Sequence, residues 1–221
     1  VRMSFLISFF LKNADLINNI GVLFNIFYAI FNLILGIVYD SLWYVTVGIY
    51  YLMVFIIRFQ LIKKELRARS MRDNTQKIKF EYKVYRRTAL FLILLCVFSA
   101  MIVLKNISLQ KSHEGGVFPI LTACAYTLYR IVVCVINLLS LKRQKHPIPI
   151  AACTVNFSVA AVSLIALQNS ILSYFEDTVK LAKYLNGALS TLIFITVITI
   201  SVMMIKSSHR KLKSLSNSVF L

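Results

Sequence analysis

The chain has 221 residues, of which 59% are hydrophobic, and its mean hydropathy is +0.77. A soluble domain of this length cannot bury so much apolar surface, so the composition indicates an integral membrane protein. The 25 Lys and Arg residues outnumber the eight Asp and Glu residues, which gives a net charge of +17. Because the basic residues lie in short segments between apolar runs, they suit anionic lipid headgroups, and we expect no nucleic-acid partner.

Six stretches are long enough to cross about 30 Å of hydrocarbon as helices. Polar connections at 39–41, 112–116 and 173–183 group them into three helical hairpins. We therefore predict an all-α fold, a polytopic transmembrane helical bundle of six spans in three hairpins, with 1–221 as a single domain. In chain order the predicted spans are 16–38, 41–62, 88–109, 117–141, 149–169 and 185–205.

The first span carries polar and small residues on one helical face, at steps of four, three and four: Asn25, Ala29, Asn32 and Gly36. The fifth span repeats the four and three steps: Asn156, Ala160 and Ser163. Small residues and amides hold membrane helices together, so we expect these two spans at the centre of the bundle. The same amides also suit a water-filled cavity that binds a solute, and both interpretations remain open.

A basic segment at 63–87 follows the second span and is expected on the cytoplasmic side. Its Ile78, Tyr82 and Tyr85 recur at helical spacing among lysines and arginines. Such a pattern is typical of an interfacial helix on an anionic leaflet, and equally of a solvated extension of the neighbouring spans. Arg58, just before this segment, lies near the end of its span, where its side chain is expected to reach the headgroups.

Arg130 lies in the middle of the fourth span, roughly 18 Å from either end at 1.5 Å per residue. A charge at this depth costs several kcal/mol and usually faces a cavity or a partner. No acidic residue is expected at the same depth. The flanking Tyr126 and Tyr129 and the fork of guanidinium donors suit a bound carboxylate or phosphate. The alternative is that Arg130 bonds helix carbonyls, the amides of the other spans or a lipid phosphate.

The sequence has none of the side-chain arrangements that membrane enzymes use for catalysis, so we expect that the protein is not an enzyme. The three histidines, His113, His146 and His209, fall in separate loops, and no span has a central carboxylate. The same absence argues against proton coupling. The four cysteines lie inside apolar runs without a CxxC pair, so no disulfide, metal or cofactor is expected. The first 13 residues have no secretory cleavage site, so they are expected to be retained.

The distribution of Lys and Arg predicts the orientation in the membrane. Nineteen of the 25 lie in the N-terminal stretch, the segment at 63–87, the connection at 141–145 and the tail after residue 205. Four lie on the opposite side, and two lie within spans. We therefore expect a multi-pass protein of the cell membrane with both termini in the cytoplasm and anionic lipids at the cytoplasmic face.

Three segments, LILGIVYDSLWYVTVGIYYLMVFIIRF (33–59), AYTLYRIVVCVINLL (125–139) and AAVSLIALQNSILSYF (160–175), carry a resemblance to a protein family. They are similar to the corresponding parts of uncharacterised six-helix integral membrane proteins of Gram-positive bacteria. The resemblance covers about five of the six spans. It implies a bacterial source and the same topology, and it brings no activity.

Two functions remain in view. The first is binding or passage of a small, possibly anionic solute through a polar path in the bundle, as in a transporter or channel. The second is a non-catalytic membrane subunit or scaffold that docks to a partner protein or to further copies of the chain. For the first, the expected ligand-binding residues are Arg130, Tyr126, Tyr129, Asn25, Asn32, Asn156 and Ser163.

The predicted orientation can be tested with single cysteines introduced at Thr75 and Glu114. A membrane-impermeant thiol reagent should label the cysteine at 75 only from the cytoplasm, because it lies in the basic segment. The cysteine at 114 should be labelled only from outside. The reverse pattern would overturn the orientation.

Overall fold

The computed structural model describes residues 14–109, 117–141, 146–174 and 179–217. Within these ranges the chain forms six helices and no strand, so the predicted all-α bundle is confirmed. Side chains are described from residue 20 onwards in the first helix and up to residue 100 in the third. The helices are α2 (Ala14–Val38), α3 (Leu42–Arg69), α4 (Asn74–Leu109), α5 (Val117–Leu141), α6 (Pro147–Tyr174) and α7 (Val179–Asn217).

Five of these helices contain a described segment long and apolar enough to cross a membrane: Ile20–Val38, Leu42–Arg69, Val117–Ser140, Pro147–Gln168 and Gly187–Ser216. The sixth helix, α4, contains the predicted span at 88–109. Large apolar side chains point outward from the bundle, as on α2, where Leu23, Phe27, Ile30 and Ile37 are exposed. Water does not favour such a surface but lipid does, so the fold is that of a multi-pass membrane protein.

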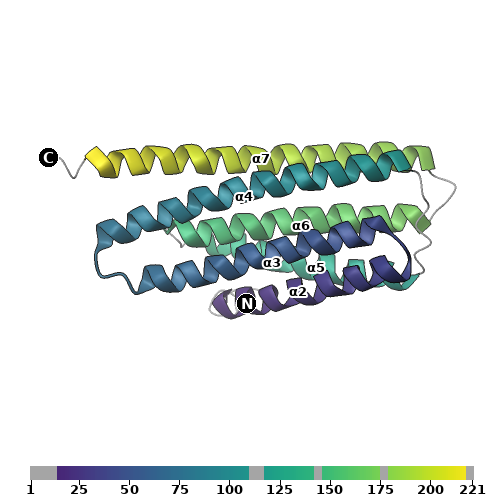
Figure 1. The fold of residues 1–221 in the computed structure, drawn as a ribbon, viewed down its shortest axis with the longest axis horizontal. Helices are drawn as coiled ribbons and strands as arrows, with labels where there is room; N and C mark the ends of the chain where they lie inside the picture. Colours follow the sequence, from purple (N-terminus) through teal and green to yellow (C-terminus); the bar gives the residue numbers. More distant parts are fainter. Residues whose placement is uncertain (1–13, 110–116, 142–145, 175–178, 218–221) are drawn as a thin grey trace, which may run out of the picture.

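The helices run side by side along the long axis of the molecule (Figure 1). The most extensive contacts join α2 with α3, α4 with α7 and α5 with α6. The first pair is the predicted first hairpin, whereas α4 and α5 make no contact within the described residues. The pairing therefore departs from the predicted order of hairpins. Short connections also join α3 to α4 and α5 to α6, and these consecutive helices contact each other, whereas α4 pairs with α7 from a distant part of the chain. The predicted turn at 112–116 lies outside the described residues.

Helix α6 is central, because it contacts α3, α4, α5 and α7. The prediction that the fifth span is central is therefore confirmed. The prediction that the first span is central is wrong. Helix α2 contacts only α3 and α5 within the described residues and lies at the edge of the bundle. Its polar stripe is buried as predicted, yet it occupies only one face. In contrast, α6 buries small side chains on several faces: Ala151, Cys153, Ser158, Ala160 and Ala161.

A tight turn joins α2 to α3. Asp40 adopts a left-handed conformation with φ 46°, which an aspartate tolerates better than most residues, and the Ser41 N–H donates to the carbonyl of Gly36 at 3.0 Å. A Cβ at Gly36 would lie 2.5 Å from Val45 Cγ2 and 2.8 Å from the backbone nitrogen of Val45. The absent side chain of Gly36 therefore lets the two helices approach closely.

The basic segment at 63–87 forms a helical extension rather than a separate interfacial helix. Helix α3 continues to Arg69, and α4 begins at Asn74. Asp73 caps α4, because its Oδ1 accepts the Thr75 N–H at 2.8 Å. This end of the bundle, where α3, α5 and α7 end and α4 and α6 begin, is called the basic end below (left in Figure 1).

Replacing Gly36 with alanine should destabilise the protein. The new Cβ would clash with the backbone of α3, and overpacking of this kind costs about 1–3 kcal/mol. Gly187→Ala is the matched control, because a Cβ there meets nothing within 4 Å and alanine favours a helix by about 1 kcal/mol. Thermal unfolding in detergent should give a lower midpoint for Gly36→Ala and no decrease for Gly187→Ala. Equal midpoints would show that the close approach is unimportant.

Candidate functional site

Two arginines are buried inside the bundle, although the sequence suggested this for Arg130 alone. Arg130 is 1% exposed and Arg58 is 4% exposed. The prediction that Arg58 reaches the headgroups is wrong, because its guanidinium turns towards Gly21 of α2. Burying a charge in a medium of low dielectric is costly, so both guanidinium groups require polar groups around them.

Arg130 uses little of its hydrogen-bonding capacity. Its Nη2 donates to Oδ1 of Asn156 at 3.4 Å, which is long for such a bond. Its Cζ lies 6.0 Å from the centre of the Tyr126 ring. The buried Nε and Nη1 atoms donate to no acceptor in the part of the chain that the structure describes. A guanidinium carries five N–H donors, so several of them are available to a ligand.

Tyr126 joins α5 to α2 next to this arginine. Its hydroxyl donates to Oδ1 of Asn25 at 2.9 Å. Its ring stacks on Tyr28 with 3.7 Å between centroids, and Tyr51 of α3 meets it edge-on at 5.2 Å. Stacking and edge-to-face contacts each contribute about 0.5–1.5 kcal/mol beyond the area that they bury. The aromatic cluster thus holds three helices in fixed positions around Arg130.

Tyr129 and Arg58 meet at Gly21. A Cβ on Gly21 would lie 3.1 Å from Nη1 of Arg58 and 3.2 Å from the hydroxyl of Tyr129. Because glycine has no side chain, the polar groups of Arg58 on α3 and Tyr129 on α5 fit against α2 at this position. The Tyr129 hydroxyl is buried and has no hydrogen-bond partner among the described residues. We call the following set the arginine site: Gly21, Asn25, Arg58, Tyr126, Tyr129, Arg130 and Asn156.

Five of the seven predicted ligand-binding residues belong to the arginine site. The other two are buried but bonded elsewhere. The Asn32 amide donates to the carbonyl of Tyr28 in its own helix at 2.8 Å. The Ser163 hydroxyl donates to the carbonyl of Ala160 at 2.7 Å. Both side chains satisfy helix carbonyls, which is the packing interpretation of the polar stripes.

The acidic side chains that the structure describes lie at the two ends of the bundle. Asp40 lies in the turn at the opposite end from the basic end, and Glu65, Asp73 and Glu81 lie at the basic end itself. Burying a guanidinium costs several kcal/mol unless an opposite charge and hydrogen bonds compensate. The unused donors of Arg130, beside the buried Tyr129 hydroxyl and Asn25 amide, are therefore suited chemically to hold an anion.

Sequence reasoning missed Arg58, although a signal for it exists. Tyr51, Val54, Arg58 and Leu61 follow one another at steps of three, four and three, and all four are buried. This spacing places Arg58 on the inner face of α3. For Arg58, the helical face therefore predicted burial better than the distance from the end of the span did.

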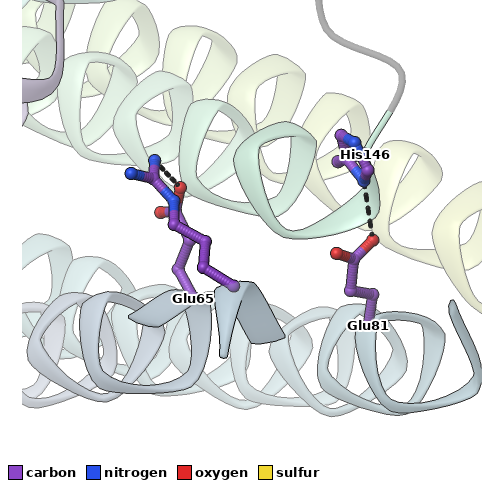
Figure 2. Close-up of polar contacts among 4 residues, drawn as sticks. Glu65, Glu81 and His146 are labelled. Atoms are coloured by element: carbon purple, nitrogen blue, oxygen red, sulfur yellow. Dashed lines mark hydrogen bonds and ion pairs between the residues drawn. The ribbon is translucent and has the colours of Figure 1, made fainter. Parts of the chain in front are cut away.

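A second polar feature is a cavity of about 300 Å³ at the basic end, between α3, α4, α5 and α6. Figure 2 shows two polar contacts of residues that line it: the ion pair of Arg69 with Glu65 at 2.7 Å, and the contact of His146 Nδ1 with Glu81 Oε2 at 3.2 Å. His146 precedes α6, as its predicted place in a loop requires. Its contact with Glu81 spans 65 positions, and no local pattern could have predicted it. Glu81 is only 3% exposed.

Comparisons with models of protein families, with curated proteins and with solved structures found no match to this chain. The resemblance to six-helix membrane proteins of Gram-positive bacteria therefore stays a prediction. The function has to be argued from the geometry of the two polar features.

Tyr126→Phe should destabilise the protein and Tyr129→Phe should not. The first change removes the hydroxyl that donates to Asn25 and leaves the buried amide oxygen of Asn25 without that hydrogen bond, at a cost of about 1–3 kcal/mol. The second removes a hydroxyl that makes no hydrogen bond to the described residues. Chemical denaturation of both variants beside the parent measures the difference. Equal losses of stability would show that the Tyr126–Asn25 bond contributes little.

Proposed function

We propose that the protein binds a small anionic solute at the arginine site, within a transporter-like or channel-like bundle. The observation that carries this proposal is the buried Arg130, whose Nε and Nη1 donate to no described acceptor. A planar carboxylate or a tetrahedral oxyanion would accept from both nitrogens at once, in the bidentate geometry that guanidinium groups favour.

The neighbouring groups support the same ligand chemistry. The Tyr129 hydroxyl and the Asn25 amide Nδ2 are buried donors without a described acceptor. An anion accepted by Arg130 would supply the acceptor that these buried donors lack, and it would lower the cost of a guanidinium in low dielectric.

The alternative function, docking to a partner subunit or to further copies, requires a flat surface of small residues towards lipid. The described outer surface of α2 is instead formed by large side chains such as Phe27 and Ile34, and its small residues Ala29 and Gly36 face inward. This distribution favours the solute over the partner.

The basic end faces the cytoplasm in this proposal, and the bilayer is the cell membrane of a bacterium. The support is the excess of Lys and Arg at the basic end over the opposite end of the bundle. Anionic headgroups would meet these residues at the cytoplasmic leaflet.

Arg130→Leu should abolish anion binding while leaving the protein folded. Titration of the purified protein in nanodiscs with inorganic phosphate, sulfate and benzoate measures binding, and thermal unfolding measures stability. Arg130→Lys should weaken binding about tenfold or more, because an ammonium lacks the bidentate fork. Arg86→Leu is the matched control, since Arg86 is exposed on α4 and the change in net charge is the same.

Unfolding distinguishes a ligand-binding arginine from a structural one. The Arg130→Leu protein should unfold at the temperature of the parent or above it, because a desolvated charge has been removed. A loss of about 1–3 kcal/mol would mean that Arg130 mainly ties the helices together. The proposal also fails if the parent protein binds none of the three anions.

A further inference from the structure

The cavity at the basic end approaches the arginine site along two helices. On α6 its wall includes Ala152 and Cys153, and Asn156, which accepts from Arg130, follows one turn later. Three residues of helix span about 4.5 Å, so the cavity ends about that far from the arginine site along the axis of α6.

Helix α5 gives the same relation from the other wall. Asn137 lines the cavity, and Arg130 lies seven residues away on the same helical face. The buried Cys134 lies between them on that face, and Cys153 of α6 lines the cavity itself.

The charged groups around the cavity suit the approach of an anion. Glu65 is paired with Arg69, and Glu81 is in contact with His146, whereas Lys77 also lines the wall and has no carboxylate within salt-bridge distance among the described residues. The surrounding basic end adds a positive potential, which raises the local concentration of anions. The apolar lining includes Ile148 and Pro149, so the cavity limits the size of what enters.

A smaller cavity on the opposite side of Arg58 along α3 has a different character. It measures about 30 Å³ and is lined mainly by apolar side chains such as Trp43, Val47 and Phe194. That volume holds no more than a few water molecules. Of these two cavities, only the one at the basic end has the size and polarity to admit a hydrated anion.

We propose that the cavity at the basic end is the aqueous entrance to the arginine site, through which a small oxyanion or carboxylate reaches Arg130. This inference rests on the proposed function, because it assigns a route to the ligand of that site. The cavity volume of about 300 Å³ is at the lower limit for small-molecule sites, so the solute is a small one. The route from the cavity to Arg130 runs past Cys153 on α6 and Cys134 on α5.

Native cysteines provide the test. Two proteins are compared in nanodiscs: one retains only Cys153 and the other only Cys96, with the remaining cysteines replaced by serine. Both thiols are 4% exposed, but Cys96 packs in an apolar cluster with Ile165 and Val197. A negatively charged methanethiosulfonate reagent should modify Cys153 at least ten times faster than Cys96, because only Cys153 lines the entrance.

The second measurement asks whether the modified cavity still admits the anion. Stopped-flow tyrosine fluorescence follows the association of inorganic phosphate and benzoate with the Cys153 protein before and after modification. Association should slow at least tenfold after modification, because the added group fills the cavity. A protein that retains only Cys124, on α5 far from the basic end, should bind at an unchanged rate after the same treatment.

Each outcome decides a separate point. Modification of Cys153 no faster than that of Cys96 would overturn the entrance, because the cavity would then be closed to water. Rapid modification with unchanged association of the anion would overturn it too, because the ligand would be entering elsewhere. If the unmodified protein binds neither phosphate nor benzoate while Cys153 reacts rapidly, the proposed function itself fails, and this route then has no ligand.

Discussion

The cost of holding two guanidinium groups inside a membrane bundle is the constraint on which the rest of the structure depends. Arg58 and Arg130 are almost fully buried. Lipid cannot solvate a charge, so only neighbouring helices can supply polar groups. Helix α2 supplies Asn25, α5 supplies two tyrosines and α6 supplies Asn156. The polar residues of four helices are therefore directed to one place.

Helix packing makes that convergence possible. The turn at Asp40 and the absent side chain of Gly36 hold α2 against α3, and Gly21 leaves room where Arg58 meets Tyr129. Small residues on several faces of α6 allow four neighbours to approach it. In lipid, where no hydrophobic force drives helices together, close approach and interhelical hydrogen bonds provide the stability. The same small residues that stabilise the bundle thus determine which side chains meet.

The sequence predicted the class, the six helices and most of the arginine site, although α4 begins at Asn74 rather than at 88 and α7 ends at Asn217 rather than at 205. Composition, span length and the position of Arg130 in the middle of its span can all be read from the local sequence. Contacts between distant segments cannot be read from it. The pairing of α4 with α7 and the contact of His146 with Glu81 depend on tertiary packing alone. Arg58 was misjudged because its depth suggested an exposed end, whereas its helical face determined its burial.

The two ends of the bundle differ in a way that bears on passage beyond the arginine site. At the basic end a polar cavity stops one helical turn short of Asn156. Towards the other end, the aromatic stack of Tyr28, Tyr51 and Tyr126 closes the interior. The contact between α2 and α5 is the least extensive of those between helix pairs, and the Tyr126–Asn25 bond crosses it. In the proposed function, a solute that enters at the basic end and leaves at the opposite end would therefore have to part this contact between α2 and α5.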